Sequence, residues 1–175
     1  MIFGLFKKNK STTEIDTGWL DEVFELLGED KMKEISAFYN LFFLQLKTNV
    51  FTLLAPVNLK DDVQLHKFYT HKFSLGYVYG LIFAFLQSSD YMKKNSDKLH
   101  KILTIAMMNQ LFYFDEKEAR EIFEKARTTY NKDQIFIKGI QAGGYEWIDF
   151  YKSDCKGLMG LHFDQIGREI FKNDF

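Results

Sequence analysis

The chain has 175 residues, with 23 Lys and Arg against 24 Asp and Glu. This length suits one domain with a sizeable core, and the balanced charge argues against a dedicated nucleic-acid binder, which would carry a basic surplus. The single cysteine, Cys155, excludes an internal disulfide and favours a reducing compartment, so we expect a cytoplasmic protein.

The N-terminal residues combine an apolar cluster with the lysines that follow it. This order is the reverse of a signal peptide, and the apolar part is too short to cross a bilayer. We therefore expect residues 1–16 to form a flexible segment ahead of the folded domain. An alternative is contact with a membrane surface through four apolar side chains, which are Ile2, Phe3, Leu5 and Phe6.

Apolar residues spaced three and four positions apart predict an amphipathic helix over residues 19–27, which Gly28 ends. Asp30 is expected to cap a second helix, and Pro56 forbids that helix from continuing. The apolar stripe of the second helix consists of Met32, Ile35, Phe38, Tyr39, Phe42, Leu46, Val50 and Leu53.

A third helix is expected to begin near Asn58 and to continue to Leu86. Over residues 73–86 apolar side chains point in every direction, which predicts a buried central helix. Small residues recur there every four positions and would let another backbone approach closely. These small residues are Gly76, Gly80 and Ala84.

The second half of the chain predicts four more helices. Ser96 is expected to cap the fourth helix, and Asp115 with Glu118 resembles a capping box at the start of the fifth. The sixth covers residues 135–151, and the last follows a turn at residues 153–157 and carries Met159, Phe163, Ile166 and Ile170.

Glycines in the sixth helix are interpreted as packing positions. Gly139 and Gly143 are expected to mark a close helix crossing or a kink. A phosphate-binding turn is the weaker interpretation, because no strand precedes them.

No sustained alternation of apolar and polar residues predicts a strand. We therefore expect an all-α fold in which residues 1–175 form a single-domain irregular bundle of about six to seven helices around the central helix near residues 73–86.

No residue pattern indicates catalysis, a metal or a cofactor. The four histidines, His66, His71, His100 and His162, lack chelating spacing, and Cys155 with His162 matches no known motif. An enzyme whose site forms only in space stays open, but the absence of a motif favours a protein that is not an enzyme.

An acidic run is the most distinctive charge feature. Residues 11–30 carry seven acidic side chains and no Lys or Arg. This run is either a solvated helix face or a docking surface for a protein partner with a basic surface. The residues assigned to such a surface are Asp21, Glu22, Glu25 and Glu29.

We therefore expect a non-catalytic bacterial cytoplasmic protein that acts by protein–protein binding, with exposed aromatic residues as anchors. In character it is compatible with immunity proteins and antitoxins, although no motif supports that class. The alternative is a small-molecule or lipid-binding protein in which the aromatic residues line a cavity. A homo-oligomer that uses the small-residue face of the central helix also stays open.

Overall fold

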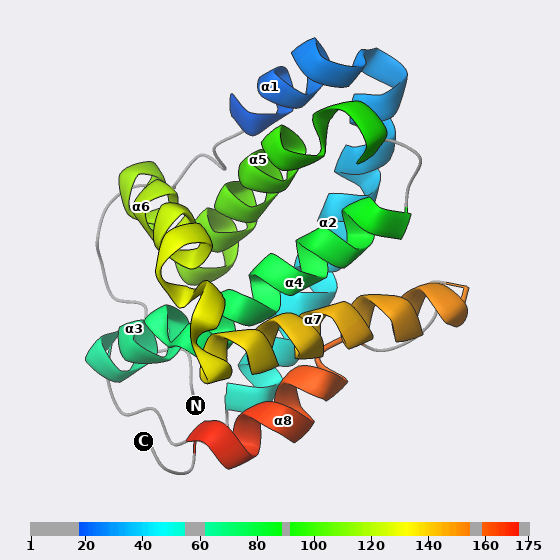
Figure 1. Cartoon of the computed structure of the whole chain (residues 1–175). Helices are drawn as coiled ribbons and strands as arrows, with labels where there is room; N and C mark the ends of the chain where they lie inside the picture. The colour runs from blue at the N-terminus through cyan, green and yellow to red at the C-terminus, as the bar shows by residue number, and fades with distance from the viewer. Residues whose placement is uncertain (1–17, 55–61, 89–91, 155–158, 172–175) are drawn as a thin grey trace.

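The computed structural model describes residues 18–54, 62–88, 92–154 and 159–171, and within these ranges it contains helices and no strand (Figure 1). The expected all-α fold is confirmed, with eight α-helices and one 3₁₀ helix among the described residues. In chain order these are α1 (Gly18–Leu27), α2 (Glu29–Leu54), α3 (Asp62–Thr70), α4 (Lys72–Ser88), α5 (Met92–Phe112), α6 (Glu116–Thr128), η2 (Tyr130–Lys132), α7 (Gln134–Lys152) and α8 (Leu161–Phe171). The expected N-terminal segment, including the residues assigned to membrane contact, lies outside the described residues. The same is true of Asn58, Cys155 and Gly157.

Gly28 separates α1 from α2, as the sequence predicts. Its φ of 82° is one that residues with a side chain rarely adopt. The cap assigned to Asp30 is wrong, because α2 already begins at Glu29 and the Gly28 carbonyl accepts the Met32 N–H at 3.0 Å. Asp30 instead lies in the first turn, where a carboxylate favourably faces the positive end of the helix dipole.

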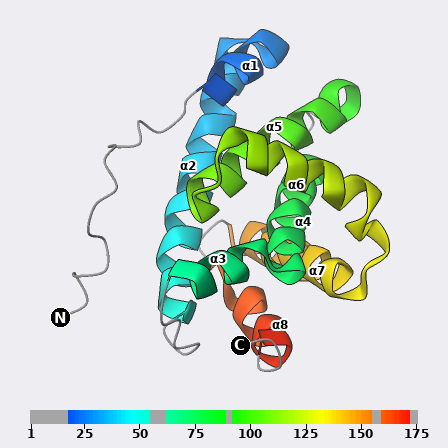
Figure 2. The ribbon, with the colours of Figure 1, turned by 90° about the vertical axis from the view of Figure 1, so that its left-hand side faces the viewer.

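Helix α2 runs along one side of the molecule (Figure 2). The expected stripe is buried at Ile35, Tyr39, Phe42 and Leu46, and these side chains belong to the main core. The side chains of Val50 and Leu53 are outside the described part of the chain.

The long third helix expected from the sequence is two helices, α3 and α4, with a break at His71. At this break the His71 Nδ1 atom accepts the Phe73 N–H at 3.2 Å, and the Ser74 hydroxyl donates to the Phe68 carbonyl at 2.8 Å. Side-chain bonds therefore replace part of the helical ladder and end α3 without a proline or glycine.

Helix α4 is the central helix, as predicted. Eleven of its 17 residues are buried, and Phe83 is a large apolar side chain that it leaves exposed. It packs between α5 on one side and α7 on the other (Figure 1).

Helix α5 begins at Met92 instead of at Ser96. Asn95 has non-helical angles, φ −133° and ψ 21°, so the expected start at Ser96 corresponds to a kink. The start of α6 is confirmed, since the Asp115 carboxylate accepts the Glu118 N–H at 2.8 Å.

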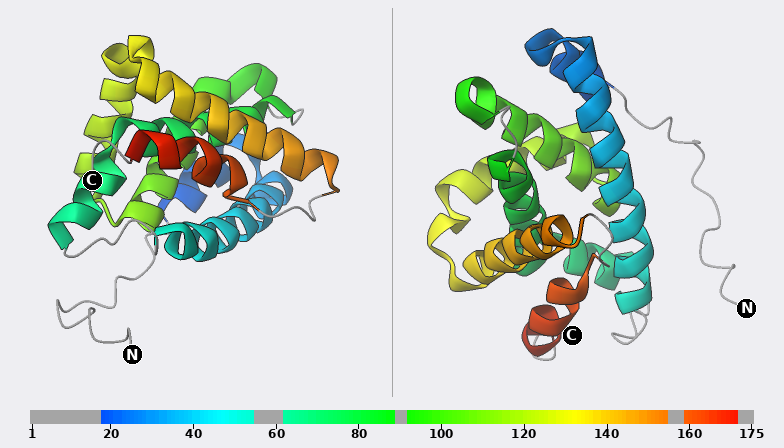
Figure 3. Two further views of the ribbon diagram at one scale, coloured as in Figure 1. Left: turned by 90° about the horizontal axis from the view of Figure 1, so that it is seen from below. Right: turned by 90° about the vertical axis from the view of Figure 1, so that its right-hand side faces the viewer.

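Helix α7 continues through Gly143 and Gly144, and it is capped by Asp133, which accepts the N–H groups of Ile135 and Phe136. Helix α8 lies against α7 (Figure 3). It begins only at Leu161, after Gly160 with φ 101°, so Met159 is buried but precedes the helix that was expected to contain it.

Candidate functional site

The four glycines that the sequence assigns to close packing lie at one contact, between α4 and α7. A Cβ on Gly80 would stand 2.2 Å from the Ile140 carbonyl oxygen, and a Cβ on Gly143 would stand 2.1 Å from that of Tyr77. Gly76 and Gly139 are equally tight. The backbones of the two helices are therefore in direct contact within one chain, where a Cβ has no room.

Polar contacts hold α4 and α7 together at both ends. The Lys72 ammonium group pairs with Asp133, the residue that caps α7. This hydrogen bond lowers the pKa of Asp133 and raises that of Lys72. At the other end the Trp147 indole N–H donates to the Ser88 hydroxyl at 2.9 Å. The two helices thus run in the same direction and form a rigid platform.

Ala84, the third small residue of α4, lies outside the glycine contact and borders an apolar groove of about 270 Å³. The groove is lined by Ala84, Gln87, Ser88, Trp147, Ile148, Tyr151 and Lys152. Two of the lining residues, Ile148 and Tyr151, are large exposed side chains, and so are Tyr145 of α7 and Leu161 of α8. We name these four residues the α7 aromatic face. The three α7 residues are spaced by three, so they follow one side of the helix.

Glu146 is a buried carboxylate that sequence reasoning missed. It is 2% exposed and accepts the N–H groups of Leu161 at 3.2 Å, His162 at 2.9 Å and Phe163 at 3.4 Å, and the Tyr77 hydroxyl at 3.2 Å. Burial raises the pKa of Glu146, while the N–H groups at the start of α8 act in the opposite direction. Since its oxygens are engaged by these donors, Glu146 fixes α8 in place.

The acidic residues predicted to meet a partner are partly paired inside the protein. Glu22 lies 3.8 Å from Arg120 of α6, and Glu29 forms an ion pair with Lys33 at 2.5 Å. Asp21 and Glu25 are exposed, as is Phe24 between them. Two of the four carboxylates are thus paired with basic groups of this chain, so the surface formed by α1 and the start of α2 carries a smaller excess of negative charge than the sequence run suggests.

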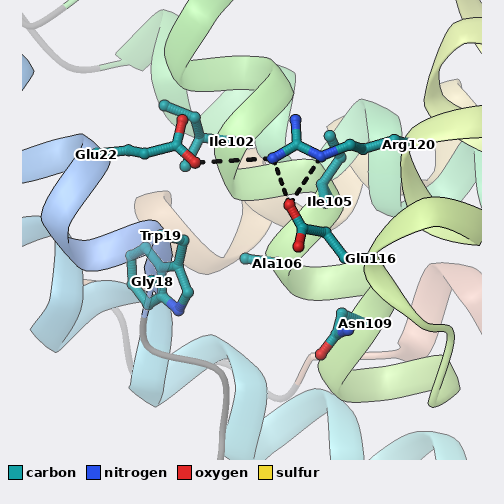
Figure 4. A pocket seen from close by; sticks show the side chains of 9 residues that line it. All are labelled: Gly18, Trp19, Glu22, Ile102, Ile105, Ala106, Asn109, Glu116 and Arg120. Carbon is teal, nitrogen blue, oxygen red and sulfur yellow. Dashed lines mark hydrogen bonds and ion pairs between the residues drawn. The ribbon is translucent and has the colours of Figure 1, made fainter.

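A pocket of about 150 Å³ opens between α1, α5 and α6 (Figure 4). It is lined by Gly18, Trp19, Glu22, Ile102, Ile105, Ala106, Asn109, Glu116 and Arg120. Arg120 donates to Glu116 Oε1 from Nε at 2.9 Å and from Nη2 at 2.6 Å, as the helical spacing of the two residues predicts.

The histidines do not converge. His66 lies 3.8 Å from Glu118, and His162 lies 2.7 Å from Asp149. His100 is buried, its Nε2 atom is 3.0 Å from the Tyr79 carbonyl oxygen, and burial lowers its pKa to about 4. Among the described residues no three His, Cys, Asp or Glu side chains form a group suited to a metal ion.

Comparison with known protein families, with curated proteins and with solved structures finds no match to this chain. In the described ranges no helix combines the length and the apolar character needed to cross a membrane.

Proposed function

We propose that the protein acts by binding a protein partner without catalysing a reaction, and that the α7 aromatic face is the anchor of that contact. The observation that carries the proposal is the row of Tyr145, Ile148 and Tyr151, which are 53%, 40% and 55% exposed on one side of α7. Large apolar side chains gathered at the surface are characteristic of interaction sites, and tyrosine is enriched among the residues that dominate binding energy.

The surroundings of this face favour a preorganised contact. The groove beside it takes Trp147 and Ala84 as walls, so a partner side chain has a concave place to enter. Helix α7 is held against α4 by the glycine contact and by the Trp147 to Ser88 hydrogen bond. A rigid support lowers the entropy lost on binding, which strengthens association for the same contact area.

The acidic residues of α1 and of the start of α2 have a second role in this proposal. In Figure 1 helix α1 lies at the top of the molecule and α7 lies well below it, so the two surfaces are separate. We propose that Asp21, Glu22, Glu25 and Glu29 attract a partner with a basic surface and accelerate its approach. An inhibitor of a basic effector in the bacterial cytoplasm, of the immunity or antitoxin type, fits this arrangement.

A crosslinking experiment tests the anchor. A photoreactive amino acid replaces Tyr151 or, as the matched control, Val63 of α3, which is also apolar and is 77% exposed. In cells that naturally produce the protein, we expect one protein to be crosslinked in stoichiometric amount through position 151 and not through position 63. The absence of a crosslinked protein at position 151, or equal crosslinking at both positions, would contradict the proposal.

The partner found in this way allows two further checks. A variant with Tyr145→Ser, Ile148→Ser and Tyr151→Ser should fold and lose the partner, because these side chains are exposed and do not belong to the buried core cluster, although the Tyr151 ring lies 5.7 Å from that of Trp147. Reversing charge with Asp21→Lys and Glu25→Lys should lower the association rate at low salt and leave the dissociation rate unchanged. An unchanged association rate would refute the steering role alone.

A further inference from the structure

The pocket between α1, α5 and α6 is remote from the α7 aromatic face, and it differs from the apolar groove there by its charged rim. Its floor is formed by Ile102, Ile105 and Ala106 of α5, which are buried residues. Trp19 forms a wall (Figure 4). An apolar interior with a few converging polar groups is the usual construction of a small-molecule site.

The charge of the rim selects the kind of ligand. Two carboxylates, Glu22 and Glu116, meet one guanidinium group, Arg120, so the rim carries one net negative charge (Figure 4). Arg120 is bound closely to Glu116, whereas its distance to Glu22 is 3.8 Å, which is beyond hydrogen-bonding range. The Glu22 carboxylate can therefore accept a hydrogen bond from a ligand.

Trp19 and Glu22 are three residues apart on α1, so the aromatic ring and the carboxylate face the same side of the helix. An aromatic face beside a carboxylate attracts an organic cation through two electrostatic contributions. A volume of about 150 Å³ is that of a cavity which holds one benzene ring. We propose that this pocket binds a small organic cation of about the size of benzylamine, with its apolar part on the α5 floor and its ammonium group between Trp19 and Glu22.

Three probes of the same shape and different charge test the proposal, namely benzylamine, benzyl alcohol and benzoate. The protein has two tryptophans, so the indole N–H signals in a nitrogen–proton NMR spectrum report on the pocket through Trp19 and on the remote groove through Trp147. We expect benzylamine to shift the Trp19 signal until the shift saturates, with a dissociation constant below about 10 mM, which a ligand of this size can reach. The Trp147 signal should not move, and the neutral and anionic probes should bind at least about fivefold more weakly.

Variants separate the pocket from non-specific binding. Glu22→Gln should weaken the binding of benzylamine about two- to fivefold, the effect typical of losing a partly exposed ion pair. Glu25→Gln, on the same helix but outside the pocket, should leave the affinity for benzylamine unchanged. Ala106→Leu should fill the pocket and abolish the binding of benzylamine, and a cooperative thermal unfolding transition would show that this variant folds. If that variant fails to fold, the comparison of Glu22→Gln with Glu25→Gln decides.

Three results would overturn the proposal. The first is a Trp19 signal that benzylamine leaves unmoved at about 10 mM, and the second is benzoate binding as tightly as benzylamine. The third is an affinity for benzylamine that falls equally in Glu22→Gln and Glu25→Gln, or that falls in neither variant.

Discussion

Two helix contacts of this protein are built in opposite ways. Between α4 and α7 four glycines bring the backbones together, and polar bonds at Lys72 and Ser88 hold the ends. Where α1 meets α5 and α6, side chains make the contact, a pocket remains open, and Arg120 joins two exposed carboxylates. The contact between α4 and α7 has no room for added side-chain atoms, which suits a rigid scaffold. The contact of α1 with α5 and α6 contains an open pocket and solvent-exposed charged groups, which suits ligand binding.

The glycine contact gives the largest predicted effect. Gly143→Ala should lower the free energy of unfolding by about 4 kcal/mol, because the new methyl group would stand against the Tyr77 carbonyl and force the helices apart. Urea denaturation measures this loss. Gly144→Ala is the matched control in the next position, where no atom lies within 4 Å, and it should be neutral or stabilising by up to about 1 kcal/mol. Equal stability of the two variants would show that the backbones are not in contact.

His100 should make the stability of the core depend on pH. Because burial lowers its pKa from 6.5 to about 4, the unfolded chain binds a proton between these values that the folded protein does not bind. The wild type should therefore lose about 3 kcal/mol as the pH falls from 7 to 4, in comparison with a His100→Gln variant measured over the same range. Parallel curves for the two proteins would mean that His100 is not buried in its neutral form.

Removing the carboxylate that fixes α8 should have a smaller effect. Glu146→Ala leaves three backbone N–H groups and the Tyr77 hydroxyl without their acceptor, but it also relieves the cost of burying a carboxylate. We expect a net loss of about 2 kcal/mol, and a smaller loss for Glu146→Gln, whose amide oxygen still accepts. Denaturation curves test this order, and a Glu146→Ala protein as stable as the wild type would contradict it.

The ion pair at the α1 corner gives the smallest expected change. Glu22→Gln should alter the free energy of unfolding by no more than about 0.5 kcal/mol, since both partners are 44% exposed and solvent screens their attraction. A loss above about 2 kcal/mol in the same denaturation assay would show that this corner is as tightly built as the glycine contact.

Local signals in the sequence predicted local structure well. The Asp115 cap and the end of α1 at Gly28 are confirmed, because each depends on residues within one turn. The break at His71 was missed, since no glycine or proline marks it and it depends on side-chain bonds to Phe73 and Phe68. Helix boundaries of this kind are set by tertiary context.

The candidate sites were harder to predict than the helices. Glu146 accepts hydrogen bonds from backbone N–H groups of a later helix, α8, so an acidic residue beside Trp147 gave no indication that it would be buried. The pocket joins α1 to α5 and α6, which come much later in the sequence. Arg120 of α6 pairs with Glu22, which belongs to an acidic run that contains no base of its own. Such pairings follow from packing and cannot be read from spacing along the chain.

Native-state hydrogen exchange tests the contrast between the two contacts most directly. Amides of α4 and α7 around Gly80 and Gly143 should exchange only through global unfolding, with an opening free energy equal to that from denaturation. Amides of α1 around Glu22 should exchange through local opening at a clearly lower free energy. Amides of α1 that are protected as strongly as those of α4, or an α4 and α7 contact that opens before α1, would contradict this account.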